Sequence, residues 1–355
     1  MKLSDLSIKN LHIPFKHNFQ HSSADRNTTE SVLVTALCED GNRALGEGCP
    51  RAYVTGESLS TAHDFFHTHR DDFLSITQLN ELIDWIDHHR SVIDENPAAF
   101  CAVELALLNA LSLNIGQSIE HTLSLPELEG EFQYSAVLGT SEPGRFRTQL
   151  ERYLAIGFSD YKIKLFGKPK IDRSNLDVIR RYARTDIRVR FDANNLWSTT
   201  CDAIAYLQDL GFPIFALEEP LSVKDYDGSY KIYKELGAQI ILDESFTKLA
   251  DFEHIQREPE PWIINLRVSK MGGLLRSLSV AERAAECGVR IIVGAQVGET
   301  SILTRAALTV ANAYRDIVLA QEGAFGTHLL ERDITDSPIM FGARGILNAE
   351  QVSHP

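Results

Sequence analysis

Two lysines, Lys162 and Lys164, lie two residues apart in the segment YKIKL (161–165), whose other residues favour a β-strand. Residues i and i+2 of a strand project from the same face, so both ammonium groups share one environment. On a solvent-exposed face the pair would be an ordinary solubilising feature, because lysine is seldom buried. In the interior of a barrel, two like charges would instead be forced together.

Carboxylates stand at the ends of the next three apolar segments of the chain. They are Asp192 in FDAN, Glu218 and Glu219 in LEEP, and Asp243 and Glu244 in LDES. Adjacent residues of a strand face opposite sides, so we expect only one member of each pair to point inward. Three carboxylates from consecutive strands suit a hard divalent cation such as Mg²⁺, whose other ligands are water and substrate.

Lysines flank this acidic series. Lys164 precedes Asp192, and Lys270, which we expect at the end of the following strand, comes after Asp243. A metal ion with a lysine on each flank indicates acid–base chemistry on both faces of a bound carbanion.

The spacing of these residues predicts the fold that positions them. From about residue 133, eight short apolar segments alternate with amphipathic helical patterns, and equivalent positions recur about every 26 residues. One β–turn–α–turn unit needs this length, and eight units close a (β/α)8-type barrel whose strand ends converge on one mouth. A doubly wound sheet is the alternative α/β fold, but the first turn, VLGTSEPGR, is not a glycine-rich phosphate turn.

The first part of the chain predicts a separate domain. Short extended segments up to about residue 50 indicate an antiparallel sheet, and helical patterns follow near 58–70, 77–90 and 97–114. We therefore expect an α+β capping domain over residues 1–125 and the barrel over 126–330, with part of the C-terminal segment 330–355 able to pack on the capping domain.

Composition excludes several classes of function. The 355 residues are 44% hydrophobic and 24% charged, which is typical of a folded protein of two domains. A net charge of -14 argues against nucleic acid or an anionic membrane as a partner. We see no signal peptide and no run of transmembrane length, and the scattered cysteines suit reduced thiols, so we expect a cytoplasmic protein with a small-molecule substrate.

The motifs KIK, FDANNLW, LEEP, LDES and NLRVSKMGG, in this order, resemble the enolase superfamily. The lysine arrangement resembles its muconate-lactonizing-enzyme (muconate cycloisomerase) subgroup, among the mandelate racemase/muconate lactonizing enzyme-like proteins. The resemblance covers nearly the whole chain, since GEGCPRAYVTGES looks like the capping-domain loop, and GAQVGETS and FGTHLL look like the ends of the seventh and eighth strands. No single motif is specific for this superfamily, but the whole set in this order is.

The resemblance implies a Mg²⁺-dependent enzyme, and a homo-oligomer, that abstracts a proton α to a carboxylate through an enediolate. A lysine base must be neutral, and we expect Lys162 and the metal to lower the pKa of Lys164. By resemblance, the metal ligands are Asp192, Glu218 and Asp243, the acid–base groups are Lys164 and Lys270, and Lys162 assists Lys164.

Lysines on both faces permit racemisation or epimerisation of an amino-acid derivative or dipeptide, which is our leading interpretation. A cycloisomerase or syn-dehydratase of a carboxylic acid, of the muconate cycloisomerase, o-succinylbenzoate synthase or acid dehydratase type, needs the same enediolate and is the alternative. A non-catalytic barrel scaffold is more remote, because all the motif positions are intact.

We expect substrate contacts from the segments 17–26 and 49–56 and from the strand ends. Dipeptide epimerases of the subgroup typically carry Asp-x-Asp at the end of strand eight, where it holds the substrate's amino group. Here AQEGAFG offers a single carboxylate, which weakens the dipeptide interpretation. The candidate contacts are Arg26, Arg51, Tyr53, Asn194, Glu299 and Glu322.

Overall fold

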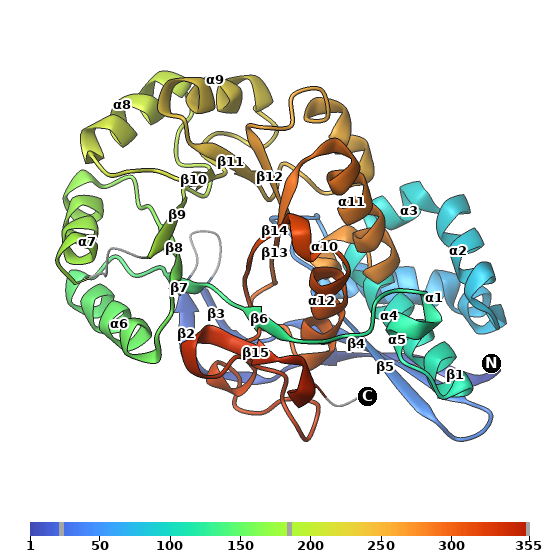
Figure 1. Cartoon of the computed structure of the whole chain (residues 1–355). Coiled ribbons are helices and arrows are strands. Elements are labelled where there is room, and N and C mark those ends of the chain that lie inside the picture. The colour runs from blue at the N-terminus through green and yellow to red at the C-terminus, as the bar shows by residue number, and fades with distance from the viewer. Residues whose placement is uncertain (21–24, 183–186, 353–355) are drawn as a thin grey trace.

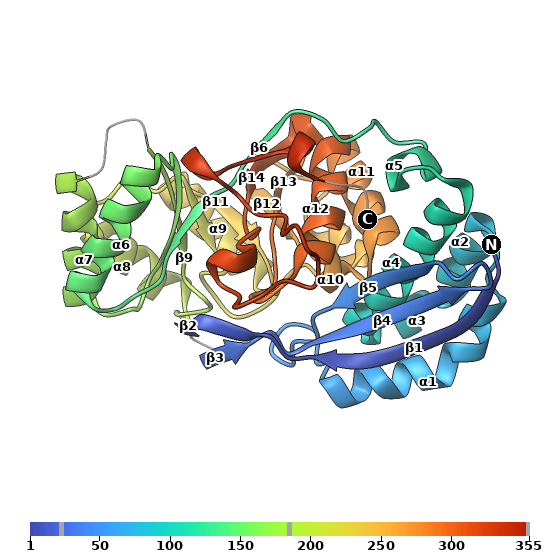
Figure 2. The same cartoon turned by 90° about the horizontal axis from the view of Figure 1, so that it is seen from below.

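The computed structural model describes residues 1–20, 25–182 and 187–352, without the side chains of 17–20, 25 and 143. A curled parallel sheet ringed by helices forms one unit, and an α+β unit built from the start of the chain lies against it (Figures 1 and 2). Both predicted units are present.

Eight parallel strands follow one another around the sheet in sequence order, from β7 to β14. Where the last meets the first, the Ser135 amide donates to the Gln321 carbonyl at 2.8 Å and Tyr134 forms a parallel bridge with Gln321. The predicted barrel is confirmed. Its strands are β7 (Ala136–Leu138), β8 (Asp160–Lys164), β9 (Arg188–Asp192), β10 (Ala216–Glu218), β11 (Gln239–Leu242), β12 (Trp262–Leu266), β13 (Arg290–Val293) and β14 (Val318–Gln321).

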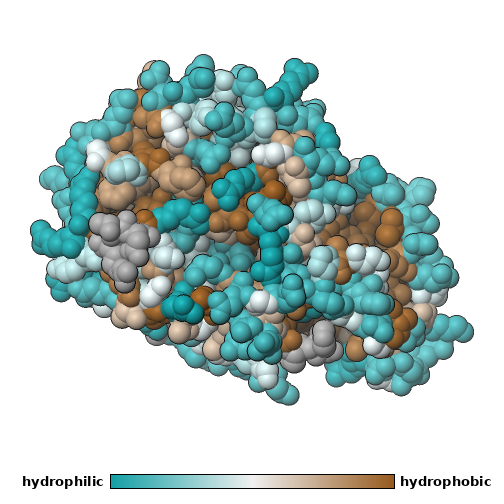
Figure 3. Space-filling model, in the orientation of Figure 1, coloured by the Kyte–Doolittle hydropathy of each residue, from teal (hydrophilic) through white to brown (hydrophobic). Residues whose placement is uncertain are grey.

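Helices surround the sheet and return the chain from each strand to the next (Figure 1). The step from β11 to β12 uses only the 3₁₀ helix η1 (Leu249–His254), so one of the seven steps between successive strands lacks a full helix. On the face shown in Figure 3 the surface is mostly hydrophilic, with hydrophobic patches over the barrel. The outer helices are α6 (Pro143–Ile156), α7 (Pro169–Tyr182), α8 (Thr200–Leu210), α9 (Tyr226–Leu236), α11 (Leu274–Cys287) and α12 (Ser301–Ala313).

The capping domain combines a three-stranded antiparallel sheet, a hairpin and helices, as predicted. The sheet has the order β1 (Leu3–Leu11), β4 (Ser31–Cys38), β5 (Arg43–Gly48), and the hairpin pairs β2 (Pro14–Gln20) with β3 (Asp25–Thr28). The helices are α1 (Leu59–Ser75), α2 (Leu79–His88), α3 (Arg90–Glu95), α4 (Pro97–Ile115) and α5 (Ile119–Thr122).

Helix α4 corrects one expectation. Within the described residues it is long and apolar enough to cross a membrane, with a mean hydropathy of 1.7, although we predicted no such run. Most of it is buried, because β5 packs directly on it: a Cβ at Gly46 would lie 2.0 Å from the Ala102 carbonyl oxygen. This close contact explains both the apolar helix and the glycine.

The C-terminal segment binds both units. The Lys16 amide of the capping domain donates to the Leu329 carbonyl at 2.8 Å, and the Glu331 amide donates to the Pro14 carbonyl at 2.9 Å. Further on, β15 (Ile346–Asn348) pairs antiparallel with β6 (Glu131–Gln133), the strand that leads into the barrel. The segment therefore packs partly on the capping domain and partly on the barrel.

Two buried glutamates of the capping domain bind the starts of barrel helices. Glu104 of α4 accepts hydrogen bonds from the Leu274 and Leu275 amides at the start of α11. Glu47 of β5 accepts from the amide of Thr300 at 3.0 Å and from its hydroxyl at 2.6 Å, at the start of α12. The first amides of a helix lack intrahelical partners and carry partial positive charge, so these carboxylates hold the two units together.

Replacing Glu104 should weaken this junction. In Glu104→Ala two buried amides lose their acceptor, so we expect the free energy of unfolding to fall by about 2–3 kcal/mol in urea denaturation followed by circular dichroism. Glu95→Ala, at an exposed glutamate of the neighbouring helix α3, should leave the unfolding curve unchanged. Equal curves for the two variants would contradict the role of Glu104.

Candidate active site

The register of the sheet brings the predicted residues to one mouth. Lys164 at the end of β8 lies beside Asp192 at the end of β9, and Asp192 lies beside Glu218 at the end of β10. Asp243 directly follows β11. Parallel strands in this register place the four side chains at one level of the barrel.

These side chains line a cavity of about 90 Å³. Carboxylates outnumber cationic groups two to one along its wall, and this excess of negative charge suits a divalent cation. The charged residues that line it are Lys162, Lys164, Arg267, Asp192, Glu218, Asp243, Glu244, Glu299 and Glu322.

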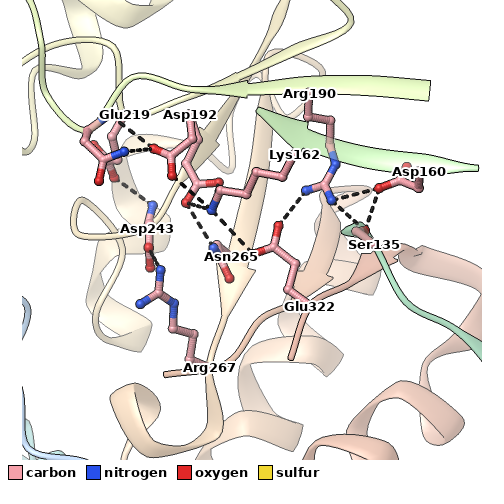
Figure 4. Close-up of polar contacts among 12 residues, drawn as sticks. Ser135, Asp160, Lys162, Arg190, Asp192, Glu219, Asp243, Asn265, Arg267 and Glu322 are labelled. Carbon is pink, nitrogen blue, oxygen red and sulfur yellow. Dashed lines mark hydrogen bonds and ion pairs between the residues drawn. The ribbon is translucent and has the colours of Figure 1, made fainter. Parts of the chain in front are cut away.

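Lys162 is surrounded by carboxylates (Figure 4). Its Nζ lies 2.7 Å from Glu218 Oε2, 3.3 Å from Asp192 Oδ2 and 3.4 Å from Glu322 Oε2. Burial alone would lower the pKa of Lys162, but the three carboxylates outweigh it and raise the pKa above its ordinary value. Lys162 therefore stays charged and neutralises the acidic wall.

Lys164 has the opposite environment. It is buried, it lines the cavity, and within the described part of the chain its Nζ has no hydrogen-bond partner. Burial is the main cause that lowers the pKa of Lys164; Lys162 adds to it and Asp192 opposes it. We expected Lys162 and the metal to lower this pKa; Lys162 does so, but desolvation has the larger effect. The neutral form that a base requires is thus favoured.

Lys270 approaches from the other side of the barrel. In a ring of eight strands, β12 lies four places from β8 and so faces it. The prediction that Lys270 belongs to a strand is wrong, because β12 ends at Leu266 and Lys270 lies on the single-turn helix α10 (Val268–Met271). Burial, followed by Arg267, lowers the pKa of Lys270.

Three hydrogen bonds to neighbouring residues hold the Lys270 ammonium in place. Its Nζ donates to the Asp243 carbonyl at 2.7 Å, to Asp243 Oδ1 at 3.0 Å and to the Asn265 carbonyl at 2.7 Å. Among the described residues that line the cavity, Lys270 is not included. It thus stands behind Asp243 and must release these bonds to reach a substrate.

The three predicted metal ligands share a mouth but do not form a closed cage. Asp192 and Glu218 both meet Lys162, whereas Asp243 is paired with Arg267 and Lys270. In the regions that the structure describes, no three His, Cys, Asp or Glu side chains are grouped closely enough to hold a metal ion. Cationic side chains neutralise these carboxylates, and that pairing separates Asp243 from the other two.

The rule of one inward carboxylate per pair holds for one pair only. Glu219 turns away from the cavity and accepts from the Asp243 and Ser245 amides, at 2.7 and 2.8 Å. Asp243 and Glu244, in contrast, both line the cavity. The prediction fails there because β11 ends at Leu242, so strand alternation no longer applies to the pair.

The three substrate contacts predicted in the capping domain lie in different environments. Arg51 is fully buried, and its guanidinium donates to four backbone carbonyls, including that of Val297 at 2.8 Å, so the structure does not support it as a substrate contact. Arg26 pairs with Glu30 and lies over the ring of Tyr53, at 5.9 Å from its centroid. Tyr53 itself lines the cavity. The other expected contacts in the segment 17–25 lie outside the described side chains.

The strand-end candidates all line the cavity. Asn194 donates to Asp192 and fixes that carboxylate. Glu299 accepts from the Gln296 amide at 2.6 Å, and burial raises the pKa of Glu299 to about 8. Glu322 is already paired with Lys162 and, at 2.9 Å, with Arg190. Burial would raise the pKa of Glu322, but these two cations hold it below its ordinary value.

Sequence analysis missed Arg190, a buried residue whose guanidinium points toward Glu322 (Figure 4). Its side chain is completely buried and joins Glu322 to Asp160, at 2.9 Å from each carboxylate. The signal was present, because Arg190 precedes Asp192 by two residues on the same strand and so shares its inward face. Arg267, which directly follows β12 and lines the cavity, was also missed.

Two neighbouring arginines give a matched test of this network. Arg190→Met removes the fully buried cation that joins Asp160 to Glu322, so each buried carboxylate loses an ion pair and we expect a loss of about 3–5 kcal/mol in the free energy of unfolding. Arg188 contacts the same Asp160, but its side chain is 39% exposed, so Arg188→Met should cost only about 0–1 kcal/mol. Urea denaturation of both variants measures the difference, and similar losses would contradict the network.

Comparison with known proteins places the chain among relatives of similar length. It is 25% identical to the hydrophobic dipeptide epimerase of Enterococcus faecalis, over 92% of each chain. It is 27% identical to the L-Ala-D/L-Glu epimerase of Bacillus subtilis, over 89% of this chain and 87% of that protein. It is 24% identical to the N-succinyl-L-Arg/Lys racemase of Bacillus cereus, over 88% of this chain and 84% of that protein.

Solved structures with a similar fold include one of these relatives. The crystal structure of the dipeptide epimerase from Enterococcus faecalis, complexed with Mg and the dipeptide L-Leu-L-Tyr, has a TM-score of 0.84 to this chain and covers 98% of it and 97% of the epimerase chain, at 24% identity. The family model described as enolase C-terminal domain-like matches residues 145–347, and this match confirms the resemblance carried by the motifs. The chain belongs to the enolase C-terminal domain-like family of the enolase superfamily.

Proposed function

We propose that this protein is a Mg²⁺-dependent isomerase that racemises or epimerises an amino-acid derivative by moving the proton α to its carboxylate. The observation that carries the proposal is that Lys164 ends β8 and Lys270 follows β12, four strands away around the barrel, with the acidic ends of β9, β10 and β11 between them. Moving a proton from one face of a carbon to the other needs one such group on each face.

The acidic wall suits the metal that this chemistry needs. Asp192, Glu218 and Asp243 would hold Mg²⁺, as oxygen ligands on three consecutive strands. The excess of carboxylates along the cavity supports this assignment, as does the Mg-bound structure of the Enterococcus faecalis relative. The bound ion would stabilise the negative charge that develops on the substrate carboxylate when the α-proton leaves.

Each of the two lysines transfers a proton on one face of the α-carbon. Lys164, whose pKa is lowered mainly by burial, accepts the α-proton on its side, and Lys270 supplies a proton to the opposite face, so that the configuration inverts. The roles exchange for the other enantiomer. Lys162 remains charged at the base of the cavity and is a positioning group for Asp192 and Glu218.

The ion pairs of Glu322 limit the class of substrate that the site can bind. A free ammonium would need an unpaired carboxylate at the end of β14, yet Glu322 already neutralises Lys162 and Arg190. We therefore favour an amino acid whose amine is blocked as an amide over a dipeptide with a free amino terminus. That the protein is cytoplasmic and forms a homo-oligomer stays a prediction.

Removing either lysine tests the mechanism. We expect Lys164→Ala and Lys270→Ala each to lower the rate of α-proton exchange with inversion by at least about 10²–10⁴-fold, because inversion needs an acid–base group on each face. Exchange of the α-hydrogen of N-acyl amino acids in D₂O, followed by NMR, measures this rate, and Lys168→Ala, on the loop after β8, is the control. Full exchange with inversion in either variant would refute the mechanism, and a vinylic or keto product would indicate a dehydratase instead.

Removing the metal, or one of its ligands, tests the cofactor. EDTA should abolish exchange and added Mg²⁺ should restore it. In calorimetric titration, Asp192→Asn should bind Mg²⁺ at least about tenfold more weakly, because one charged ligand is lost. Glu235→Gln, at an exposed glutamate on α9, should bind Mg²⁺ as the unaltered protein does. Equal Mg²⁺ affinity in the two variants would show that Asp192 is not a ligand.

A further inference from the structure

Arg267 is the first residue after β12, and it lines the cavity that Lys164 also lines. In the order of the sheet β12 lies four strands from β8, which ends at Lys164, so the two cations reach this cavity from strands that face each other around the barrel. Lys270, three residues further on, is not among the described residues that line it. Of the two cations that follow β12, the guanidinium is therefore the one that borders the space for a substrate.

Neighbouring groups hold the Arg267 guanidinium at the cavity wall. Its Nη1 donates to Gln296 Oε1 at 3.0 Å, and its Nη2 donates to Asp243. Gly294, directly after β13, leaves room for the side chain, because a Cβ there would lie 3.2 Å from Cγ of Arg267. The side chain is 12% exposed, and its buried Nε has no hydrogen-bond partner within the described residues. The protein thus fixes the guanidinium and leaves part of its donor capacity unused.

Asp243 lies between this guanidinium and the Lys270 ammonium. Arg267 binds Oδ2 of Asp243 and Lys270 binds Oδ1, and the side chain of Lys270 is fully buried. A guanidinium keeps its proton at any physiological pH, so it cannot act as a base. The cavity is therefore bordered by an amine at the end of β8 and by a permanent cation at the end of β12.

We propose that Arg267 is a further catalytic residue, which binds the carboxylate of the substrate and stabilises the enediolate. The inference rests on the proposed function and adds a group that the two-lysine mechanism does not use. When Lys164 Nζ takes the α-proton, the electron pair of the broken C–H bond moves onto the carboxylate, beside the fixed charge of Arg267. The planar guanidinium also matches the two oxygens of a carboxylate.

Binding of the substrate carboxylate needs one exchange of partners. Arg267 turns the N–H that it gives to Asp243 toward the substrate, Asp243 turns to the Mg²⁺ that it is proposed to hold, and Gln296 keeps Nη1 in place. Because Arg267 borders the cavity and Lys270 stands behind Asp243, the two faces of the α-carbon meet unlike groups. Exchange of the α-hydrogen with retention, through Lys164, should therefore be faster than inversion.

Two substitutions of Arg267 test its role in the reaction, with N-acetyl amino acids in D₂O and NMR detection. Arg267→Met should lower the rate of α-hydrogen exchange by about 10²–10³-fold although Lys164 is intact, because the charge beside the enediolate is lost. Arg267→Lys should keep part of the exchange and raise the ratio of inversion to exchange, because it places an amine at the end of β12. Arg257→Met, at an exposed arginine between η1 and β12, is the matched control and should leave both rates unchanged.

Ligand binding tests Arg267 without turnover. The hydroxamate of N-acetyl-leucine carries two oxygens in the place of those of the enediolate, and calorimetric titration with Mg²⁺ present measures its affinity. Arg267→Met should bind it at least about tenfold more weakly than Arg257→Met does, because a hydrogen bond from a charged donor is lost. Arg267→Lys, which keeps the charge and loses the planar fork, should bind with intermediate affinity. Circular dichroism checks that each variant is folded.

Equal hydroxamate affinity in the Arg267 variants and the control, or exchange in Arg267→Met at the rate of the control, would overturn the proposal. Inversion as fast as exchange in the unaltered protein would also overturn it, because a second amine would then reach the substrate as readily as Lys164. Failure of the unaltered protein to exchange any N-acetyl amino acid would instead refute the proposed function, and the hydroxamate titration would still decide whether Arg267 binds the ligand.

Discussion

A lysine ammonium held among three carboxylates inside the barrel sets the electrostatics of this protein. Lys162 meets Asp192, Glu218 and Glu322, and Glu322 is in turn paired with Arg190, which reaches Asp160. A buried charge without a partner costs several kcal/mol, so each member of this chain of charges requires the next. Because cations and carboxylates alternate along this chain of charges, the inward side chains at β8, β9, β10 and the end of β14 are fixed before any ligand binds.

This network also explains how two lysines on one strand face acquire different properties. Lys162 lies deep among carboxylates, which raise its pKa, whereas Lys164, one pleat closer to the mouth, lacks hydrogen-bond partners for its Nζ within the described residues, and burial lowers its pKa. Environments that push the pKa values of neighbouring groups apart are how one site obtains both a fixed charge and a base. The lysine pair is thus one structural cation and one predicted acid–base group.

The capping domain contributes to the site and is tied to the barrel by hydrogen bonds. Glu47 and Glu104 bind the starts of α12 and α11, and Arg51 ties its own loop to the end of β13 through the Val297 carbonyl. These contacts place Tyr53 on the cavity wall. In this arrangement the barrel supplies the proposed chemistry, while Tyr53 and the strand ends bound the space left for the rest of the substrate.

The sequence by itself determined the barrel and much of its mouth. A repeat of about 26 residues demands parallel strands joined by helices, and the two-residue alternation put Lys164 and Asp192 on the inner face. Tertiary structure alone decided the rest. Where strands ended early, alternation failed, so Asp243 and Glu244 both face the cavity and Lys270 stands on a helix. Arg51 and Glu322 were assigned to substrate, yet they bind protein groups. The physical reason is that the partner of a buried charge comes from a strand far away in the chain, as Glu322 does for Lys162, and local patterns carry no record of such pairs.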